Sequence, residues 1–354
     1  MSVAATRAAE RRVRALVDGA ALLADATSEL GRRARRELVA STGLSPEGVE
    51  LALAECLETR VTDAEVAEIC ARAVSVPAAH VLLSANIFVA AHRAVALALA
   101  ASEHVRVRPS RREPAFARLL AGAAPGLFDV VAELAPASGD ALWAYGSDET
   151  LHAVRATLPP GVAFHPHGSG VGVAVIDAAH ATPVAARALA LDVIPFDQRG
   201  CLSPRAVAFV GSPEEAHAFG SLVAAELATL AERVPLGLLA SDEAADVTRF
   251  RDTLTVAGSV RRAGPGFVAT TPGGRLVVAP VGRNLAITPC DDPVALLEPV
   301  VQGLAALGLA ASDELEMRVP KAFAGARASP LGRMQRPAFD GPVDRRPLVR
   351  RPIG

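Results

Sequence analysis

The sequence predicts an α/β fold in which two lobes, each built on a parallel sheet, follow a helical segment. Three observations lead to this prediction. Short apolar runs alternate with helical patterns from about residue 78 to residue 177, a second such series follows residue 201, and roughly the first 75 residues have helical composition. Alternation of this kind is typical of βαβ units with parallel strands. A chain of 354 residues can give each lobe its own core.

The helical segment has one especially clear start. In GLSPEGVELALAECLETR, Ser45 is a good N-cap, Pro46 suits the first turn, and acidic residues follow at Glu47 and Glu50. The first 30 residues have the pattern of an amphipathic helix that carries both signs of charge, without the uninterrupted apolar core of a signal peptide.

The first lobe is expected to begin with a short buried strand and a helix that runs through Ala101. Further strands are expected in 104–110, 140–146, 162–168 and 170–177, and helices in 114–124 and 147–158. The second lobe is expected to contain a strand at 205–211, a helix from Pro213 to about Leu230, and further strands in 258–274, 275–281 and 284–290. We therefore expect a cofactor lobe at 1–163, a second lobe at 164–320 and a mobile, Pro- and Arg-rich arm at 321–354.

Composition excludes several classes of protein. The formal net charge is −2, so no overall field attracts nucleic acid or an anionic membrane, and one Trp and one Tyr leave little for base stacking. The most apolar window, 78–102, contains Asn86, His92 and Arg93, which are costly in a bilayer. Four cysteines without CxxC spacing indicate thiols in a reducing cytoplasm rather than disulfides or zinc ligands.

The stretch IPFDQRGCLSPRAV, residues 194–207, places Cys201 in an unusual setting. An acid, an amide, an arginine and a glycine precede the thiol, whereas an ordinary core cysteine is flanked by aliphatic residues. Taken alone, the stretch leaves open both a nucleophile and a buried structural cysteine. Arg199 could lower the thiol pKa or could simply pair with Asp197.

The order of several segments resembles the aldehyde dehydrogenase superfamily. The similarity is greatest to its acyl-CoA reductase branch, the long-chain fatty acyl reductases of bacterial luminescence. The segments that carry the resemblance are SANIFVAAHRAVALALAASEHVRVRPSRREP, YGSDETL, VAFHPHGSGVGVAVID, FDQRGCLSPRAV and SPLGRMQRP. This resemblance implies an aldehyde-dehydrogenase-like fold of two Rossmann-like lobes. It also implies reduction of an acyl thioester to an aldehyde.

The resemblance assigns roles to particular residues. Cys201 would attack the acyl carbonyl and hold the acyl group as a thioester, while the Asn86 side chain and the Cys201 N–H stabilise the oxyanion. Arg108 stands where the family usually has a lysine near the adenosine ribose, which favours NADPH, with NADH as the alternative. The expected cofactor-binding residues are Arg108, Pro109, Ser110, Gly146 and Ser147. GSGVG at 168–172 lacks a following helix, so we interpret it as close strand packing.

One departure from the pattern concerns FHPHG. Where hydrolytic relatives carry a glutamate base, this chain has His165, or His167 if the alignment shifts by two. Three interpretations remain open for His165: an acid/base group, a metal ligand and a structural residue at a strand end. Without a third ligand the metal interpretation is the weakest, and no metal is expected.

The resemblance also implies partners. The expected substrate is an acyl-CoA or acyl-protein thioester. An acyl-activating synthetase partner and a homo-oligomer are also expected, with neither nucleic acid nor membrane insertion. The alternatives are an acyltransferase that uses Cys201 without hydride transfer, an aldehyde dehydrogenase that runs oxidatively, and a scaffold without activity. The missing glutamate argues against the second, and the presence of Cys201 and Asn86 argues against the third.

Overall fold

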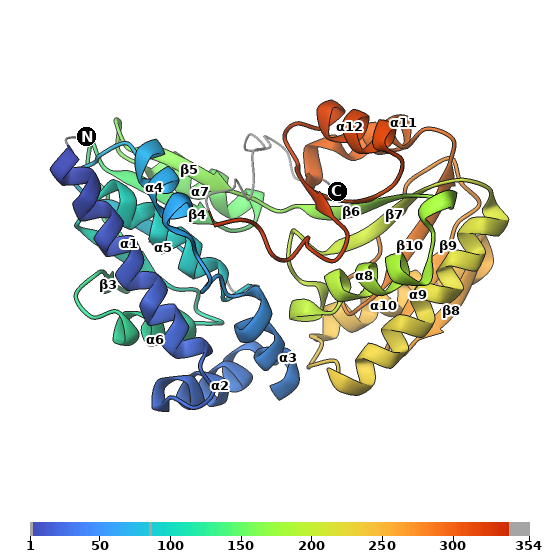
Figure 1. Ribbon diagram of the computed structural model, residues 1–354, viewed down its shortest axis with the longest axis horizontal. Coiled ribbons are helices and arrows are strands. Elements are labelled where there is room, and N and C mark those ends of the chain that lie inside the picture. The colour runs from blue at the N-terminus through green and yellow to red at the C-terminus, as the bar shows by residue number, and fades with distance from the viewer. Residues whose placement is uncertain (1–2, 85–86, 340–354) are drawn as a thin grey trace. The chain divides into compact units, whose positions relative to one another are not determined.

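The computed structural model describes residues 3–84 and 87–339, which divide into two compact units. The first unit holds residues up to Ser169 together with Ala338 and Phe339, and the second holds Gly170–Pro337. The boundary expected at 163/164 falls within a strand, Ala163–His167. Each unit has a sheet with helices packed on it (Figure 1).

The first unit is a five-stranded parallel sheet with helices before and between its strands. Its strand order is β3-β2-β1-β4-β5, in which chain order reverses between β1 and β4. The strands are β1 (Ala79–Leu82), β2 (Val105–Arg108), β3 (Asp129–Val130), β4 (Ala141–Tyr145) and β5 (Ala163–His167). The helices are α1 (Val3–Ala24), α2 (Glu29–Thr42), α3 (Pro46–Leu51), the π-helix η1 (Ala52–Cys56), α4 (Asp63–Arg72), α5 (Ala90–Ala101), α6 (Ala115–Ala123) and α7 (Asp148–Thr157).

Helices cover both faces of this sheet. Because right-handed crossovers from β1 to β2 and from β4 to β5 run in opposite directions, α5 and α7 lie on opposite faces. Strand β4 shows the consequence, since Leu142 and Ala144 pack with Leu151 of α7, while Trp143 and Tyr145 point to the other face.

The second unit repeats this topology and extends it. Its sheet has the order β12-β11-β6-β7-β10-β9-β8, in which only β8 is antiparallel to its neighbour. The strands are β6 (Val171–Asp177), β7 (Pro204–Val210), β8 (Ser259–Ala263), β9 (Gly266–Thr270), β10 (Leu285–Cys290), β11 (Leu304–Ala310) and β12 (Arg327–Pro330). The helical elements are η2 (Ala178–His180), α8 (Pro183–Val193), η3 (Pro195–Gln198), α9 (Pro213–Arg233), α10 (Ser241–Ala257), α11 (Pro293–Leu297), η4 (Glu298–Gly303) and α12 (Asp313–Ala322).

The central strands of this sheet are buried on both faces, which explains why their sequences are almost continuously apolar. In β6, Val173 and Val175 face a core that includes residues of α11 and α12, and the alternate residues face the other way. Figure 1 shows α11 and α12 on one side of the sheet and α8 and α9 on the other. Helix α10 packs on the face of α11 and α12, because its Phe250 and Leu254 contact Ala269 and Ala286, which share that face with Ala206. The prediction of two Rossmann-like lobes with parallel sheets is therefore confirmed, as is the N-terminal helical segment.

Two local expectations can be compared with the structure. Ser45 caps α3 as predicted, because its hydroxyl accepts a hydrogen bond from the Gly48 N–H at 3.0 Å. The predicted strand at 275–281 is wrong, because this segment has no regular structure. Its hydrogen bonds with β7 involve Arg205, whose carbonyl accepts from the Ala279 N–H and whose Nε donates to the Ala279 carbonyl.

The segment expected as a mobile arm begins with an ordered part of the second unit. Strand β12 pairs in parallel with β11, from Ala306 opposite Arg327 to Leu309 opposite Pro330. Ala338 and Phe339 belong to the first unit, in which Arg93 donates to the Ala338 carbonyl at 2.7 Å and the Phe339 N–H donates to Glu65 at 3.1 Å.

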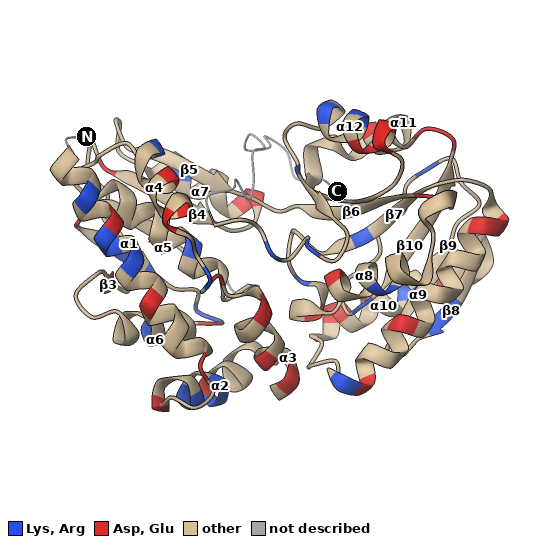
Figure 2. Cartoon of the chain, in the orientation of Figure 1, with Lys and Arg blue, Asp and Glu red and all other residues tan. Residues whose placement is uncertain are grey.

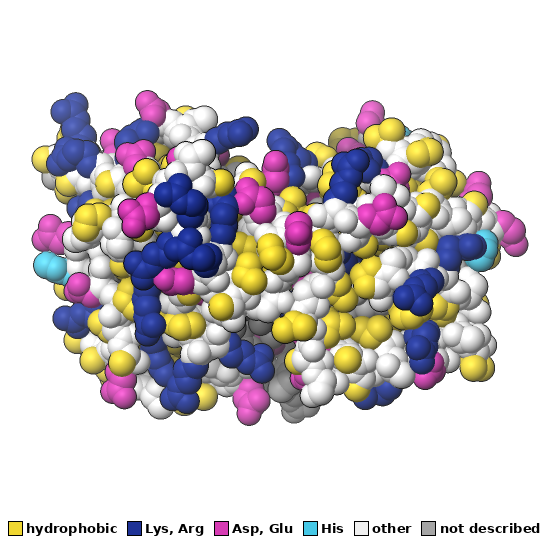
Figure 3. All heavy atoms as spheres, turned by 90° about the horizontal axis from the view of Figure 1, so that it is seen from below, with side chains coloured by type: hydrophobic (Ala, Val, Ile, Leu, Met, Phe, Trp, Pro, Cys, Tyr) yellow, Lys and Arg dark blue, Asp and Glu magenta, His cyan; other side chains and the backbone are white. Residues whose placement is uncertain are grey.

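Charge is distributed with both signs interspersed, as Figure 2 shows for α1 and α2. In the space-filling view of Figure 3, arginine side chains spread over part of the surface with acidic side chains among them. Among the described residues, no helix combines the length and the apolar character needed to cross a membrane.

Candidate active site

Cys201 lies in a tight turn between η3 and the amino end of β7. The turn is closed by the Ser203 N–H, which donates to the Gly200 carbonyl at 3.0 Å. Cys201 itself is partly exposed, whereas the residues from Asp192 to Gln198 before it are buried. The fold therefore presents this thiol at the end of a buried, fixed segment.

The segment before the thiol has an unusual backbone. Phe196, Asp197 and Gln198 have φ angles of 56°, 51° and 67°, so three successive non-glycine residues adopt the left-handed region. Each such residue costs on the order of 1–3 kcal/mol, and the conformation persists only where surrounding contacts impose it. Strain of this kind is typical of functional loops, and its supports can be identified residue by residue.

The first support is a buried ion pair. The Arg283 guanidinium donates from NH2 and Nε to Asp197 Oδ1, at 2.7 and 3.1 Å, and both side chains are only 1% exposed. The other carboxylate oxygen accepts from the Gly237 N–H at 3.0 Å. Burial lowers the pKa of Arg283, and the adjacent Asp197 carboxylate opposes that shift. The pair fixes the middle of the left-handed run.

The second support is the side-chain amide of Gln198, which is completely buried. Its Nε2 donates to the carbonyls of Pro204 and Asn284, at 2.7 and 2.6 Å, and its Oε1 accepts from the Asn284 N–H at 2.8 Å. The amide nitrogen therefore donates two hydrogen bonds and the amide oxygen accepts one, all within the protein. Gln198 thus ties both ends of the Cys201 turn to the loop before β10.

Arg199 is engaged by acidic partners. Its guanidinium forms a two-point contact with Glu243 of α10, at 2.8 and 2.9 Å, and lies 3.5 Å from Asp197 Oδ2. These contacts raise the pKa of Arg199, with the Glu243 hydrogen bonds as the largest cause. Of the two interpretations drawn from the sequence, pairing with Asp197 is confirmed, with Glu243 as an additional partner.

The other thiols have different surroundings. Burial raises the pKa of Cys70 and of Cys290 to about 11 in each case, so both are protonated at neutral pH. Cys56 is buried in η1. Each of the four cysteines, all of which the structure describes, is a thiol rather than part of a disulfide.

Close strand packing is confirmed at Gly172. A Cβ at this position would lie 2.6 Å from the Ser203 carbonyl oxygen and 2.8 Å from that of Leu202. The Gly172 N–H instead donates to the Ser203 carbonyl at 3.2 Å. Only glycine lets β6 approach the Cys201 turn this closely.

In the first unit, the expected cofactor-binding residues follow the carboxyl ends of neighbouring strands. Arg108 ends β2 and is followed by Pro109 and Ser110, all half-buried. Within the described part of the chain, no side chain or carbonyl pairs with the Arg108 guanidinium. The Ser110 hydroxyl accepts from the Arg112 N–H at 3.2 Å. These residues flank the point where strand order reverses, which is where open α/β sheets bind ligands.

Gly146 and Ser147 follow β4 on the other side of that reversal. Ser147 caps α7 by accepting from the Thr150 N–H at 3.2 Å, so the helix expected in 147–158 begins at this residue. A Cβ at Gly146 would meet only the Thr150 side chain, at 3.4 and 3.5 Å, which is ordinary contact. The fold therefore does not require glycine at position 146, and its lack of a side chain leaves room for a ligand to approach the backbone.

Asn86 lies outside the described residues. His165 is on β5, at the edge of the sheet, and its ring stacks on Trp143 with centroids 4.7 Å apart and planes 16° apart. Neighbouring atoms partly desolvate this exposed imidazole and thereby lower the pKa of His165. His167 stacks in the same way on Tyr145, at 4.4 Å and 8°. Within the described ranges, no group of three or more potential ligands is placed to hold a metal ion.

The structure also identifies residues that sequence inspection missed. Arg283 and Asn284 hold the loop from 86 positions away, and Gln335 contacts Ser203 from the C-terminal segment. The sequence held one indication of Arg283, because Gly-Arg-Asn at 282–284 places a charge where a buried strand begins, and a buried charge needs a partner. Nothing in the sequence showed which acid it would meet.

Comparison with known proteins decides the family. A family model described as acyl-CoA reductase (LuxC) matches residues 125–350, well over half of the chain. The chain belongs to the acyl-CoA reductase (LuxC) family. The match includes Gly146, His165, Cys201 and the C-terminal segment, whereas Arg108 precedes it. Membership supports reduction of an acyl group to an aldehyde as the general activity, and the resemblance expected from the sequence is confirmed. No curated protein matches the chain.

Solved structures show the fold of this acyl-CoA reductase family member. An NAD-dependent benzaldehyde dehydrogenase from Corynebacterium glutamicum is 14% identical, with a TM-score of 0.69 over 93% of this chain and 81% of that one. A putative aldehyde dehydrogenase from Burkholderia cenocepacia is 17% identical, with a TM-score of 0.67 over 92% and 79%. An oxidoreductase from Marinobacter aquaeolei is 15% identical, with a TM-score of 0.66 over 91% and 77%. The aldehyde-dehydrogenase-like fold is therefore confirmed.

Proposed function

We propose that the protein reduces an acyl thioester to an aldehyde with NADPH, through a covalent thioester on Cys201. The observation that carries the proposal is the Cys201 turn, a partly exposed thiol held by a strained and fully anchored loop, in a member of an acyl-CoA reductase family. Acyl-CoA is the proposed donor, and an acyl-protein thioester is the alternative.

The chemistry of Cys201 proceeds in two steps. Its thiolate forms a C–S bond to the acyl carbonyl, and the thiolate of coenzyme A leaves, so that a thioester is exchanged for a thioester. NADPH, when bound, supplies the hydride that reduces this enzyme thioester. As the aldehyde forms, the C–S bond to Cys201 breaks and the thiolate is regenerated. A thiol suits this sequence because a thiolate is both a good nucleophile and a good leaving group.

Both steps pass through a tetrahedral oxyanion. The Cys201 N–H and the Asn86 side chain are the proposed donors, and removal of one such donor typically costs ~10²–10³ in rate. The left-handed run before Cys201 gives the N–H a fixed direction, so it needs no reorganisation when charge develops. His165 is proposed as an acid/base group because its imidazole is exposed and its lowered pKa keeps it neutral and able to accept a proton.

The first unit fits a nicotinamide dinucleotide in three respects. Its strand order reverses between β1 and β4, position 146 leaves the backbone open, and Arg108 has a guanidinium that is not engaged by the described residues. We propose that Arg108 binds the 2′-phosphate, which distinguishes NADPH from NADH, with Pro109 and Ser110 beside it. Gly146 and Ser147 are proposed to lie next to the cofactor.

Steady-state assays test the function. Purified protein is mixed with a panel of acyl-CoAs, and oxidation of NADPH and of NADH is followed for the wild type and for Cys201→Ser. The proposal predicts acyl-dependent NADPH oxidation, with aldehyde as product, that disappears in Cys201→Ser. Acyl transfer to a nucleophile without oxidation of either nucleotide would instead establish the acyltransferase alternative.

A further inference from the structure

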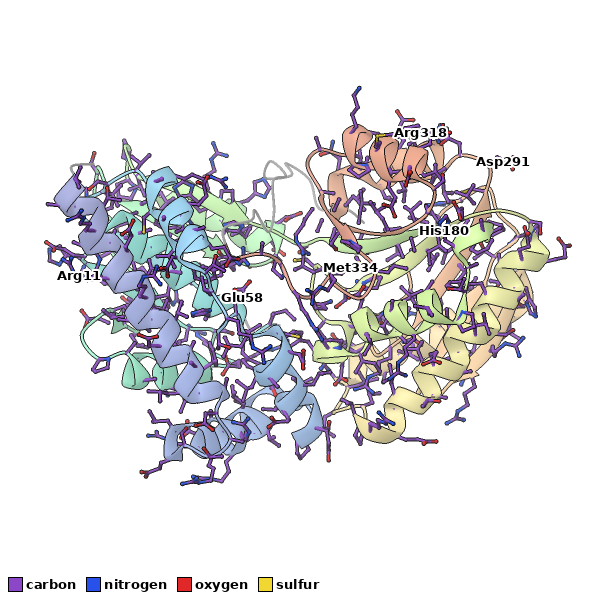
Figure 4. All side chains as sticks on the ribbon, viewed as in Figure 1. Arg11, Glu58, His180, Asp291, Arg318 and Met334 are labelled. Atoms are coloured by element: carbon purple, nitrogen blue, oxygen red, sulfur yellow. The ribbon has the colours of Figure 1, made fainter. Side chains whose placement is uncertain are left out.

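The segment after β12, residues 331–335, packs into the core of the second unit. Met334, labelled in Figure 4, is fully buried. A Cβ on Gly308 of β11 would fall 2.5 Å from the Met334 sulfur and 3.0 Å from Leu331 Cδ2, so the glycine makes room for these side chains. Arg327 also donates to the Met334 carbonyl at 2.6 Å. The position of residues 331–335 is thus determined by packing.

A buried carboxylate near the end of α8 receives this segment. Asp192 is 1% exposed, and its two oxygens accept from the Gly332 N–H at 2.6 Å and the Met334 N–H at 2.9 Å. Burial raises the pKa of Asp192 to about 7, against the opposing effect of these two N–H groups. Asp192 belongs to α8 and lies nine positions before Cys201. The C-terminal segment is therefore bound to the helix that precedes η3 and the Cys201 turn.

The next residue of the segment reaches the Cys201 turn itself. Gln335 Nε2 donates to Ser203 Oγ at 2.7 Å and to the Asp192 carbonyl at 3.2 Å, and all three residues are buried. Ser203 also donates its N–H to Gly200 and accepts the Gly172 N–H at its carbonyl. The side-chain hydroxyl, the N–H and the carbonyl of Ser203 are therefore all engaged, two residues from the thiol.

We propose that Gln335 is a positioning residue for Cys201, which it holds in place by fixing Ser203 to the main chain of Asp192. The inference rests on Cys201 as the acyl-accepting thiol. Loss of the amide removes the hydrogen bond that the Ser203 hydroxyl accepts and leaves Ser203 with its main-chain hydrogen bonds to Gly200 and Gly172. The turn then samples orientations in which the thiol and its N–H are misdirected.

The experiment compares full-length wild type with Gln335→Met and Ser203→Ala. The first substitution removes both N–H donors but keeps side-chain length, and the second removes the acceptor with little loss of volume. Leu254→Ala in α10 is the control, because Leu254 is a buried residue of a separate core cluster and its truncation destabilises the protein through packing. The readout is the rate of Cys201 alkylation by iodoacetamide against pH, quantified on the Cys201 peptide by mass spectrometry.

We expect the alkylation profile of Gln335→Met and of Ser203→Ala to shift in midpoint or to fall roughly fivefold or more in plateau, the scale of one lost hydrogen bond. The double variant should resemble the singles, because the two substitutions remove one shared contact. Leu254→Ala should match the wild type at temperatures where it is folded. Wild-type profiles in both substituted proteins, whatever their melting temperatures, would overturn the proposal and leave Gln335 a packing residue.

The test separates the inference from the proposed function. Alkylation needs neither acyl-CoA nor cofactor, so it reports on the turn alone. Acylation from acyl-CoA is measured in parallel by intact mass. Altered alkylation in Gln335→Met, together with a wild type that never acylates, supports positioning and contradicts the reductase mechanism. Unaltered alkylation with normal acylation contradicts positioning and leaves the mechanism in place.

Discussion

The buried pair Asp197–Arg283 provides the sharpest prediction of stability. Replacing Arg283 with Met removes hydrogen bonds of 2.7 and 3.1 Å to Asp197 Oδ1 and leaves a carboxylate that is 1% exposed, whose other oxygen keeps the Gly237 N–H and the longer contact with Arg199. Breaking a buried pair in this way typically costs about 3–5 kcal/mol, chiefly because one charge stays buried without its partner. We expect a loss of this size in the free energy of unfolding, measured by urea denaturation.

A double-mutant cycle identifies the origin of that loss. If the buried carboxylate that has lost Arg283 is responsible, Asp197→Asn combined with Arg283→Met should be more stable than Arg283→Met alone. The matched control is Arg251→Met, which breaks an exposed contact with Asp252 and should leave the urea midpoint unchanged.

The same variant should also release the nucleophile loop. Without Arg283 the left-handed conformation of residues 196–198 loses a principal support, so the loop relaxes toward ordinary backbone angles. We expect slower acylation of Cys201 in samples that are fully folded. A change of less than about 0.5 kcal/mol in the stability of Arg283→Met, or simple additivity in the double variant, would contradict this role for the ion pair.

Three further predictions concern the first unit. His92 is fully buried, and burial lowers its pKa to about 3. As the pH falls below about 6.5, the unfolded state therefore takes up a proton that the folded state excludes, and this residue should lower the free energy of unfolding by about 1.4 kcal/mol per pH unit. His92→Leu should make the urea midpoints less dependent on pH between pH 7 and pH 4.5. Arg108→Ala should raise KM for NADPH by roughly tenfold or more and leave KM for NADH nearly unchanged, with exposed Arg118→Ala as control; an equal effect on both nucleotides would remove Arg108 from 2′-phosphate recognition. His165→Gln should lower kcat by about 10² if the imidazole transfers a proton, whereas a loss no larger than that of His167→Gln would assign both rings to stacking on β4.

The general architecture was predictable because its signals are local. Apolar runs of strand length between helical patterns defined most strands, and an N-cap serine before proline defined the start of α3. The segment 275–281 misled this reasoning, since its apolar residues are buried by irregular contacts rather than by a ladder. Strand β12 was missed because Arg-Ala-Ser-Pro has no strand signature and pairs only through its backbone with β11.

The candidate site was predictable in its residue types but not in its supports. The sequence singled out Cys201 and the residues before it, yet a left-handed run at Phe196, Asp197 and Gln198 contradicts their local preferences. Long-range contacts support it, above all those from Arg283 and Asn284. The residues that the resemblance assigned to the cofactor follow the carboxyl ends of β2 and β4, where open α/β sheets bind ligands, whereas Cys201 lies at the amino end of β7.

Intact mass spectrometry after incubation with acyl-CoA, with cofactor withheld, shows directly whether Cys201 accepts the acyl group. We expect a mass increase of one acyl group on the wild type, located on the Cys201 peptide, lost in Cys201→Ser and released as aldehyde when NADPH is added. Aldehyde production without any adduct, or an adduct that persists in Cys201→Ser, would contradict the assignment of Cys201 as the acyl-accepting nucleophile.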